Sequence, residues 1–171
     1  MKKILLFFGL MLCTFLSGAQ QLDCSFTQAR TLKATGKVFH AEGVISFLAP
    51  DQLTMTYTKP KGEYLVISGP MLRSNTLGQQ LSIDTSKNAR FRNLRNTLLN
   101  CIMGDCETAA RDNDAELTES VKDGVRTVEM KARKASPRGY SRILMEYRNG
   151  NPVRMVLDEF GGISTEYIFT Y

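Results

Sequence analysis

Cysteines are the side chains in this sequence whose spacing suggests chemistry most directly. The chain has four, and Cys13 lies in an apolar N-terminal stretch, which leaves Cys24, Cys101 and Cys106. Five positions along one continuous helix turn two side chains in different directions, too far apart for a disulfide. Because Gly104 is expected to end a helix, the two later thiols could still meet. The sequence leaves open whether Cys101 and Cys106 form a disulfide, and an odd count leaves at least one cysteine without a partner in the chain.

Residues that could carry catalysis or bind a metal are few. His40 is the only histidine, and its neighbours place it on the polar face of a predicted strand. One histidine supports no set of nucleophile, base and carboxylate, and no glycine-rich phosphate loop is present. The cysteines lie far from His40 in sequence, so a zinc site is not indicated. We therefore expect no catalytic residue, no metal site and no cofactor, and a protein that is not an enzyme.

The first nineteen residues have the three-part pattern of a cleavable export signal. Lys2 and Lys3 precede an apolar stretch over residues 4–16, which is too short to span a bilayer as a permanent helix. Ser17-Gly18-Ala19 then supplies the small residues that precede a cleavage site. We expect residues 1–19 to be removed, leaving a protein in the periplasm.

The mature chain is expected to carry no lipid anchor and to form one domain over residues 20–171. Neither Cys13 nor Cys24 follows the small residues that a lipoprotein signal requires. Loss of Lys2 and Lys3 reduces the formal net charge from +5 to +3, which is too mild to indicate nucleic-acid binding. We expect a monomer.

Most of the mature sequence alternates apolar and polar residues with a period of two, which predicts half-buried strands. Lys122-Asp123-Gly124 is typical of a hairpin turn, in which Asp-Gly supplies the positive φ angles. Strands connected by such tight turns form an antiparallel meander. The predicted strands cover residues 39–47, 53–58, 63–68, 115–121, 125–132, 140–148 and 153–159, with a last strand ending at Tyr171.

One segment instead has the spacing of an amphipathic helix. Its apolar residues recur at helical offsets over residues 88–103, with arginines and asparagines between them. Ser86 or Asn88 can cap its start and Gly104 can end it, and we interpret the basic face as solvated. A meander curls because sheets twist, and a curled sheet covered by one helix encloses either an apolar cavity or a dry core. The apolar helical positions are Phe91, Leu94, Leu98, Leu99 and Ile102.

Several segments in order resemble the LolA family of periplasmic lipoprotein carriers. They are the strand and Pro-Asp-x-Leu turn of residues 42–53, the stretch 56–60 that ends in Lys-Pro, the apolar strand 65–69 that ends in Gly, and Ser25-Phe26-Thr27-Gln28. The resemblance implies a mainly β fold, an unclosed antiparallel β-barrel covered by an α-helical lid. Its concave face would hold lipoprotein acyl chains or another lipid. An inner-membrane release complex and an outer-membrane acceptor are the further partners that the resemblance implies.

Two features depart from that family. Ala49 stands before Pro50, where the well-known carriers have an arginine that helps to latch the lid. The signal also runs almost directly into Cys24, which leaves no room for the family's N-terminal amphipathic helix. The apolar face of the first strands together with the helix is the predicted lipid-binding site: Phe39, Ile45, Phe47, Met55, Tyr57, Leu65, Ile67, Phe91, Leu94 and Leu98.

Two other functions remain open on the sequence alone. A small outer-membrane β-barrel would explain the aromatic last strand over residues 167–171, but Arg142 and Glu146 alternate with apolar residues where lipid would have to be met. A non-carrier domain on the same fold could sense an envelope partner through an exposed edge or lid.

Overall fold

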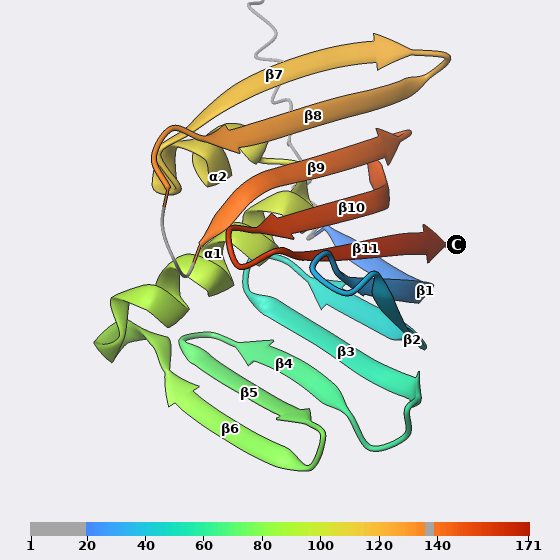
Figure 1. The fold of residues 1–171 in the computed structure, drawn as a ribbon, viewed down its shortest axis with the longest axis vertical. Coiled ribbons are helices and arrows are strands. Elements are labelled where there is room, and N and C mark those ends of the chain that lie inside the picture. The colour runs from blue at the N-terminus through green and yellow to red at the C-terminus, as the bar shows by residue number, and fades with distance from the viewer. Residues whose placement is uncertain (1–19, 136–138) are drawn as a thin grey trace, which may run out of the picture.

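The computed structural model describes residues 20–135 and 139–171, so the expected signal peptide lies outside the described residues. The described residues form one eleven-stranded antiparallel sheet with two α-helices and a short 3-10 turn, η1 (Figure 1). The helical segments are η1 (Thr85–Lys87), α1 (Ala89–Met103) and α2 (Cys106–Asp112). The strands are β1 (Gln21–Leu32), β2 (Lys37–Leu48), β3 (Gln52–Lys59), β4 (Tyr64–Ser68), β5 (Met71–Thr76), β6 (Gln79–Asp84), β7 (Ala115–Lys122), β8 (Val125–Ala132), β9 (Tyr140–Arg148), β10 (Asn151–Glu159) and β11 (Ile163–Thr170).

The chain builds the sheet outwards from its middle and then returns from the other edge. The strand order is β6-β5-β4-β3-β2-β1-β11-β10-β9-β8-β7, so β1 and β11 pair at the centre. The helices carry the chain from the β6 edge to the β7 edge along one side of the curled sheet (Figure 1). β6 and β7 do not pair with each other in the part of the chain that the structure describes. The predicted fold, an unclosed antiparallel sheet covered by helix, is therefore confirmed, and a closed barrel does not fit it.

Strand alternation assigns the faces of the sheet as the sequence predicts. Ile45 and Phe47 of β2 are buried, and Val44 between its polar neighbours is exposed on the other face. In register, Ile45 lies opposite Met55, and Met55 lies opposite Leu65 on β4. Because the side-chain period is two, this register puts the apolar residues of all three strands on one face.

Helix α1 begins and ends at the residues that the sequence indicates. The Asn88 side chain accepts a hydrogen bond from the Phe91 N–H, and Gly104 follows the helix in the left-handed region with φ of 81°. The expectation of a single helix is wrong, because the chain forms α2 after Asp105 caps it through the Thr108 N–H. α2 has only seven residues, too few for an apolar period to be recognised.

Strands β5 and β6 are further elements that the sequence analysis did not predict. β6 is the edge strand and is exposed along most of its length, so its residues carry no clear apolar alternation. The turn before it uses Leu77 at φ of 52° followed by Gly78, and a leucine is not typical of that left-handed position. Polar edge strands are common because they discourage pairing with other chains.

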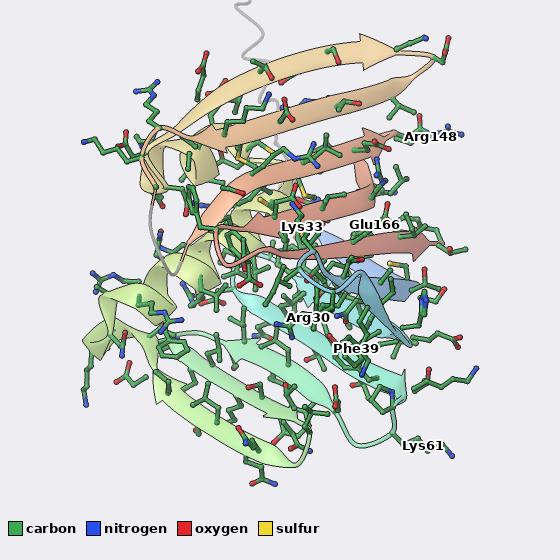
Figure 2. All side chains as sticks on the ribbon, viewed as in Figure 1. Arg30, Lys33, Phe39, Lys61, Arg148 and Glu166 are labelled. Carbon is green, nitrogen blue, oxygen red and sulfur yellow. The ribbon has the colours of Figure 1, made fainter. Side chains whose placement is uncertain are left out.

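The charges of the second half are paired across the convex face of the sheet. Arg142 lies 2.8 Å from Asp158 and 3.2 Å from Glu129, while Lys33 lies 2.9 Å from Asp158. A second group joins Arg154 to Glu146 and to Glu166, and Figure 2 labels both Lys33 and Glu166 beside the central strands. The alternating charges of β8 to β11 thus satisfy one another on the face opposite the apolar one.

Candidate functional site: the concave face and its helical cover

The concave face of the sheet is apolar from β1 to β5 and from β8 to β11. We call the side chains on it the concave face. They pack with buried residues of the two helices, including Leu99, Ile102 and Ala109, in one core cluster. The concave face comprises Leu22, Phe26, Ile45, Phe47, Leu53, Met55, Tyr57, Leu65, Ile67, Leu72, Val128, Met130, Ile143, Met145, Tyr147, Met155, Leu157, Tyr167 and Phe169.

A glycine lets the middle of this face close tightly. The Phe26 ring lies over Gly43 of β2, where an added Cβ would come within 2.6 Å of Phe26 Cζ. The same ring meets Tyr57 edge-on at 5.2 Å between centroids and Tyr167 at 5.9 Å. The aromatic side chains of four adjacent strands, β11, β1, β2 and β3, are therefore packed around one small residue.

The predicted lipid-binding residues divide into three groups by exposure. Ile45, Phe47, Met55 and Ile67 are fully buried, while Tyr57, Leu65, Phe91, Leu94 and Leu98 are half-buried. Phe39 is 46% exposed, at the end of β2 opposite Arg30 of β1 (Figure 2). The sheet residues of the set, Phe39 included by its alternation, share the concave face, and the helical ones lie on the helix that covers it.

A pocket of about 430 Å³ opens beside the N-terminal half of α1. Phe91 and Leu94 line it, so two of the ten predicted residues are brought to a cavity and the other eight are not. Tyr140 at the start of β9 forms part of its wall, and burial raises the pKa of this phenol to about 12, which keeps it neutral. The rest of the lining is Arg90, Asn93, Thr97, Asn113, Gly139 and Glu159.

Arg95 ties the first half of the helical cover to the turns of the sheet. Its Nε donates to the Gly69 carbonyl oxygen at 2.7 Å, and Nη2 lies 3.6 Å from the Asp51 carboxylate. The Arg95 side chain is only 17% exposed, so the interpretation of the whole basic face as solvated is wrong at this position. Nearby, the Thr85 hydroxyl donates to the Pro70 carbonyl at 2.7 Å.

The far end of α1 is held by two side chains of the sheet. The Tyr147 hydroxyl of β9 donates to the Cys101 carbonyl oxygen at 2.6 Å, and Arg126 Nη1 of β8 donates to the Gly104 carbonyl oxygen at 3.2 Å. The sequence analysis missed Arg95, Arg126 and Tyr147. The only sequence signal was that an arginine and a tyrosine occupy positions of otherwise apolar or solvated patterns.

The two neighbouring cysteines meet below this junction as thiols. Cys101 and Cys106 are both buried, and their side chains are hydrogen-bonded to each other. Cys24 is a half-buried thiol on β1. Across residues 20–135 and 139–171 no cluster of three or more His, Cys, Asp or Glu side chains could hold a metal. None of the helices described has the length and apolar character needed to cross a membrane.

Comparisons with known proteins agree with this architecture. The family model described as outer membrane lipoprotein carrier protein LolA matches residues 17–171. No curated protein matches the sequence. Among solved structures, a LolA superfamily protein from Nitrosomonas europaea is 8% identical with a TM-score of 0.44, covering 90% of this chain and 85% of that one.

Two further structures resemble the chain less strongly. A DUF1329 family protein from Desulfovibrio piger is 13% identical with a TM-score of 0.42, covering 90% of this chain and 85% of that chain. The lipoprotein LppX from Mycobacterium tuberculosis is 12% identical with a TM-score of 0.32, covering 86% and 85%. These similarities are too weak to support an inference about a ligand, and the family match stands without them.

Proposed function

Because the chain belongs to the LolA family, we propose that it is a periplasmic carrier that binds the acyl chains of lipoproteins, or of a related lipid, and moves them toward the outer membrane. The observation that carries the proposal is a concave apolar face that spans most of the sheet and is covered by two helices instead of a second sheet. Carriage requires no bond to be made or broken, so the protein acts without a catalytic residue.

The pocket beside α1 is the proposed entrance for an acyl chain. Phe91 and Leu94 present half-buried apolar surface there, and the buried side chains Ile45, Phe47, Met55 and Ile67 lie deeper on the concave face. Each buried methylene of an acyl chain contributes about 0.8 kcal/mol, so a full chain supplies enough energy to displace side chains that pack together in the unloaded protein. Four of the buried side chains on the concave face are methionines, whose flexible thioethers adapt to chains of varied shape.

Loading then depends on moving the helical cover away from the sheet. Arg95 holds one end of α1 to the turns at Gly69 and Asp51, and Tyr147 holds the other end. Arg95 reaches the turn that follows Ala49, so the arginine is supplied by the helix and not by the turn. A charged hydrogen bond to a carbonyl contributes about 2 kcal/mol, which is a barrier that acyl burial can overcome.

The test is direct analysis of what the protein carries. The full-length chain is expressed in its own host, purified from the envelope without detergent, and studied by native mass spectrometry and by lipid extraction. We expect a truncated N-terminus at Gln20 and co-purifying acylated species, with displacement by a fluorescent fatty acid. A mass of the polypeptide alone together with no binding of the fluorescent fatty acid would contradict the carrier role and favour an envelope-sensing domain on the same fold.

A further inference from the structure

Two buried thiols lie at the junction between the helices of the cover. Cys101 is in the last turn of α1 and is 0% exposed, while Cys106 is the first residue of α2 and is 1% exposed. The chain reverses between them because Gly104 adopts a left-handed φ of 81°, with the Gly104 N–H bonded to Cys101 O at 3.2 Å and the Asp105 N–H to Asn100 O at 2.9 Å. This reversal removes the obstacle that a continuous helix would present to contact between the two sulfurs.

Hydrogen bonds hold the thiols together and prepare them unequally for reaction. The Cys101 thiol donates to the Cys106 sulfur, which lowers the pKa of Cys106 to about 7 and raises that of Cys101. The Tyr147 hydroxyl lies 3.0 Å from Cys106 Sγ while it donates to the Cys101 carbonyl, so β9 positions both residues. A thiolate is the species that attacks a disulfide, and Cys106 is therefore the first nucleophile of the pair.

We propose that Cys101 and Cys106 are oxidised to a disulfide that fastens the end of α1 to the start of α2. The oxidant is a disulfide, either of a thiol–disulfide oxidoreductase or of a small thiol. The Cys106 thiolate attacks one of its sulfur atoms and expels the first thiolate, and Cys101 then attacks Cys106 Sγ and expels the second. The oxidant gains two electrons, and the two thiol protons pass to the leaving thiolates.

The burial of both sulfurs sets when the exchange takes place. It occurs as the chain folds, before α2 packs against β7 and β8, or when α2 opens. The proposal rests on the proposed export, because oxidising compartments preserve disulfides, and it does not depend on lipid binding. Cys24 lies on β1, where it is hydrogen-bonded to Tyr171, and it keeps its thiol.

Refolding in a glutathione buffer tests the proposal. The unfolded, reduced protein is refolded with oxidised and reduced glutathione, or with reduced glutathione alone, then alkylated in denaturant, weighed and mapped by peptide. We expect one alkylated cysteine, Cys24, in the oxidising buffer and three in the reducing buffer. Three alkylated cysteines in both buffers, or a bridge that includes Cys24, would overturn it whatever the lipid experiments find.

Matched variants separate the bridge from other effects of oxidation. In the wild type and in Cys24→Ser, oxidation should raise Tm by roughly 5 °C, since closing even a short loop restricts the unfolded chain. In Cys101→Ala/Cys106→Ala, the same buffer should change Tm by nothing measurable. An equal shift in that double variant would contradict the assignment, and if that variant fails to fold, the thiol count of the wild type decides alone.

Discussion

The Nε of Arg95 donates to the carbonyl oxygen of Gly69 at 2.7 Å, across 26 positions of sequence, and so joins helix α1 to the turn between β4 and β5. The same guanidinium lies 3.6 Å from Asp51 in the turn between β2 and β3. One helical side chain thus contacts two turns of the first half of the sheet. The cover is held there by polar contacts at its edge as well as by apolar packing beneath it.

Replacing Arg95 with methionine should loosen the cover without removing the length of the side chain. We expect the free energy of unfolding to fall by about 2 kcal/mol, because a charged hydrogen bond in a part-buried site is lost. Amide hydrogen exchange within α1 should become faster, and a fluorescent fatty acid should associate more rapidly. Arg92→Met is the control, since Arg92 is exposed and its guanidinium bonds only to the nearby Ser86 carbonyl. Equal behaviour of the two variants would remove Arg95 from the latch.

A charge at the mouth of the pocket should prevent lipid uptake. Leu94→Glu places a carboxylate on half-buried apolar surface beside Phe91, so binding of a fluorescent fatty acid should weaken by roughly tenfold or more while the far-ultraviolet circular dichroism is retained. Leu77→Glu, at a leucine that is 86% exposed in the turn between β5 and β6, should bind as the wild type does. Unchanged affinity in folded Leu94→Glu would place the entrance elsewhere.

The close packing of Phe26 on Gly43 should make this glycine intolerant of substitution. Gly43→Ala puts a methyl group within 2.6 Å of Phe26 Cζ and against the backbone carbonyl of Thr56, so one strand or ring must move. We expect the free energy of unfolding in urea to fall by about 2–3 kcal/mol, the usual cost of overpacking a core. Gly161→Ala, which meets no atom within 4 Å, should change it by less than about 0.5 kcal/mol. Similar losses in both variants would mean that the ring position is unimportant.

Asp158 should make stability depend on pH in the acid range. Burial alone would raise the pKa of this carboxyl, but hydrogen bonds from Ser164, Lys33 and Arg142 outweigh it and lower the pKa to about 2. A carboxyl whose pKa is lower in the folded than in the unfolded state stabilises the fold above pH 4. The contribution, about 2 kcal/mol, should disappear as the pH falls from about 4 to 2.

The variant Asp158→Asn isolates this carboxyl from the others. Urea unfolding should show a loss of stability at pH 7 and a flatter dependence on pH between about 4 and 2 than in the wild type. Asp123→Asn, in the exposed turn between β7 and β8, serves as the control and should follow the wild-type profile. An Asp158→Asn profile as steep as that of the wild type would assign the acid sensitivity to other groups.

Local patterns in the sequence were sufficient for the elements whose stability is decided locally. The alternation around Ile45 and Met55 determines which face each side chain takes, because a strand turns successive side chains to opposite sides. Asn88 and Gly104 bound helix α1 because capping needs only neighbouring residues, and Asp123-Gly124 forms the predicted turn with φ of 51° and 75°. The ten residues predicted for the site share one face or its cover for the same reason.

Only the tertiary structure decided which elements meet across the sheet. Strands β5 and β6 and helix α2 are too polar or too short to announce themselves, and they form because longer neighbours offer edges and apolar surface to them. The pairing of β1 with β11, the contact of Arg95 with Gly69 and the meeting of Cys101 with Cys106 depend on how the chain returns to itself. A sequence encodes periods and caps within a few residues, whereas these contacts follow from the folding of whole strands, which no single window of sequence contains.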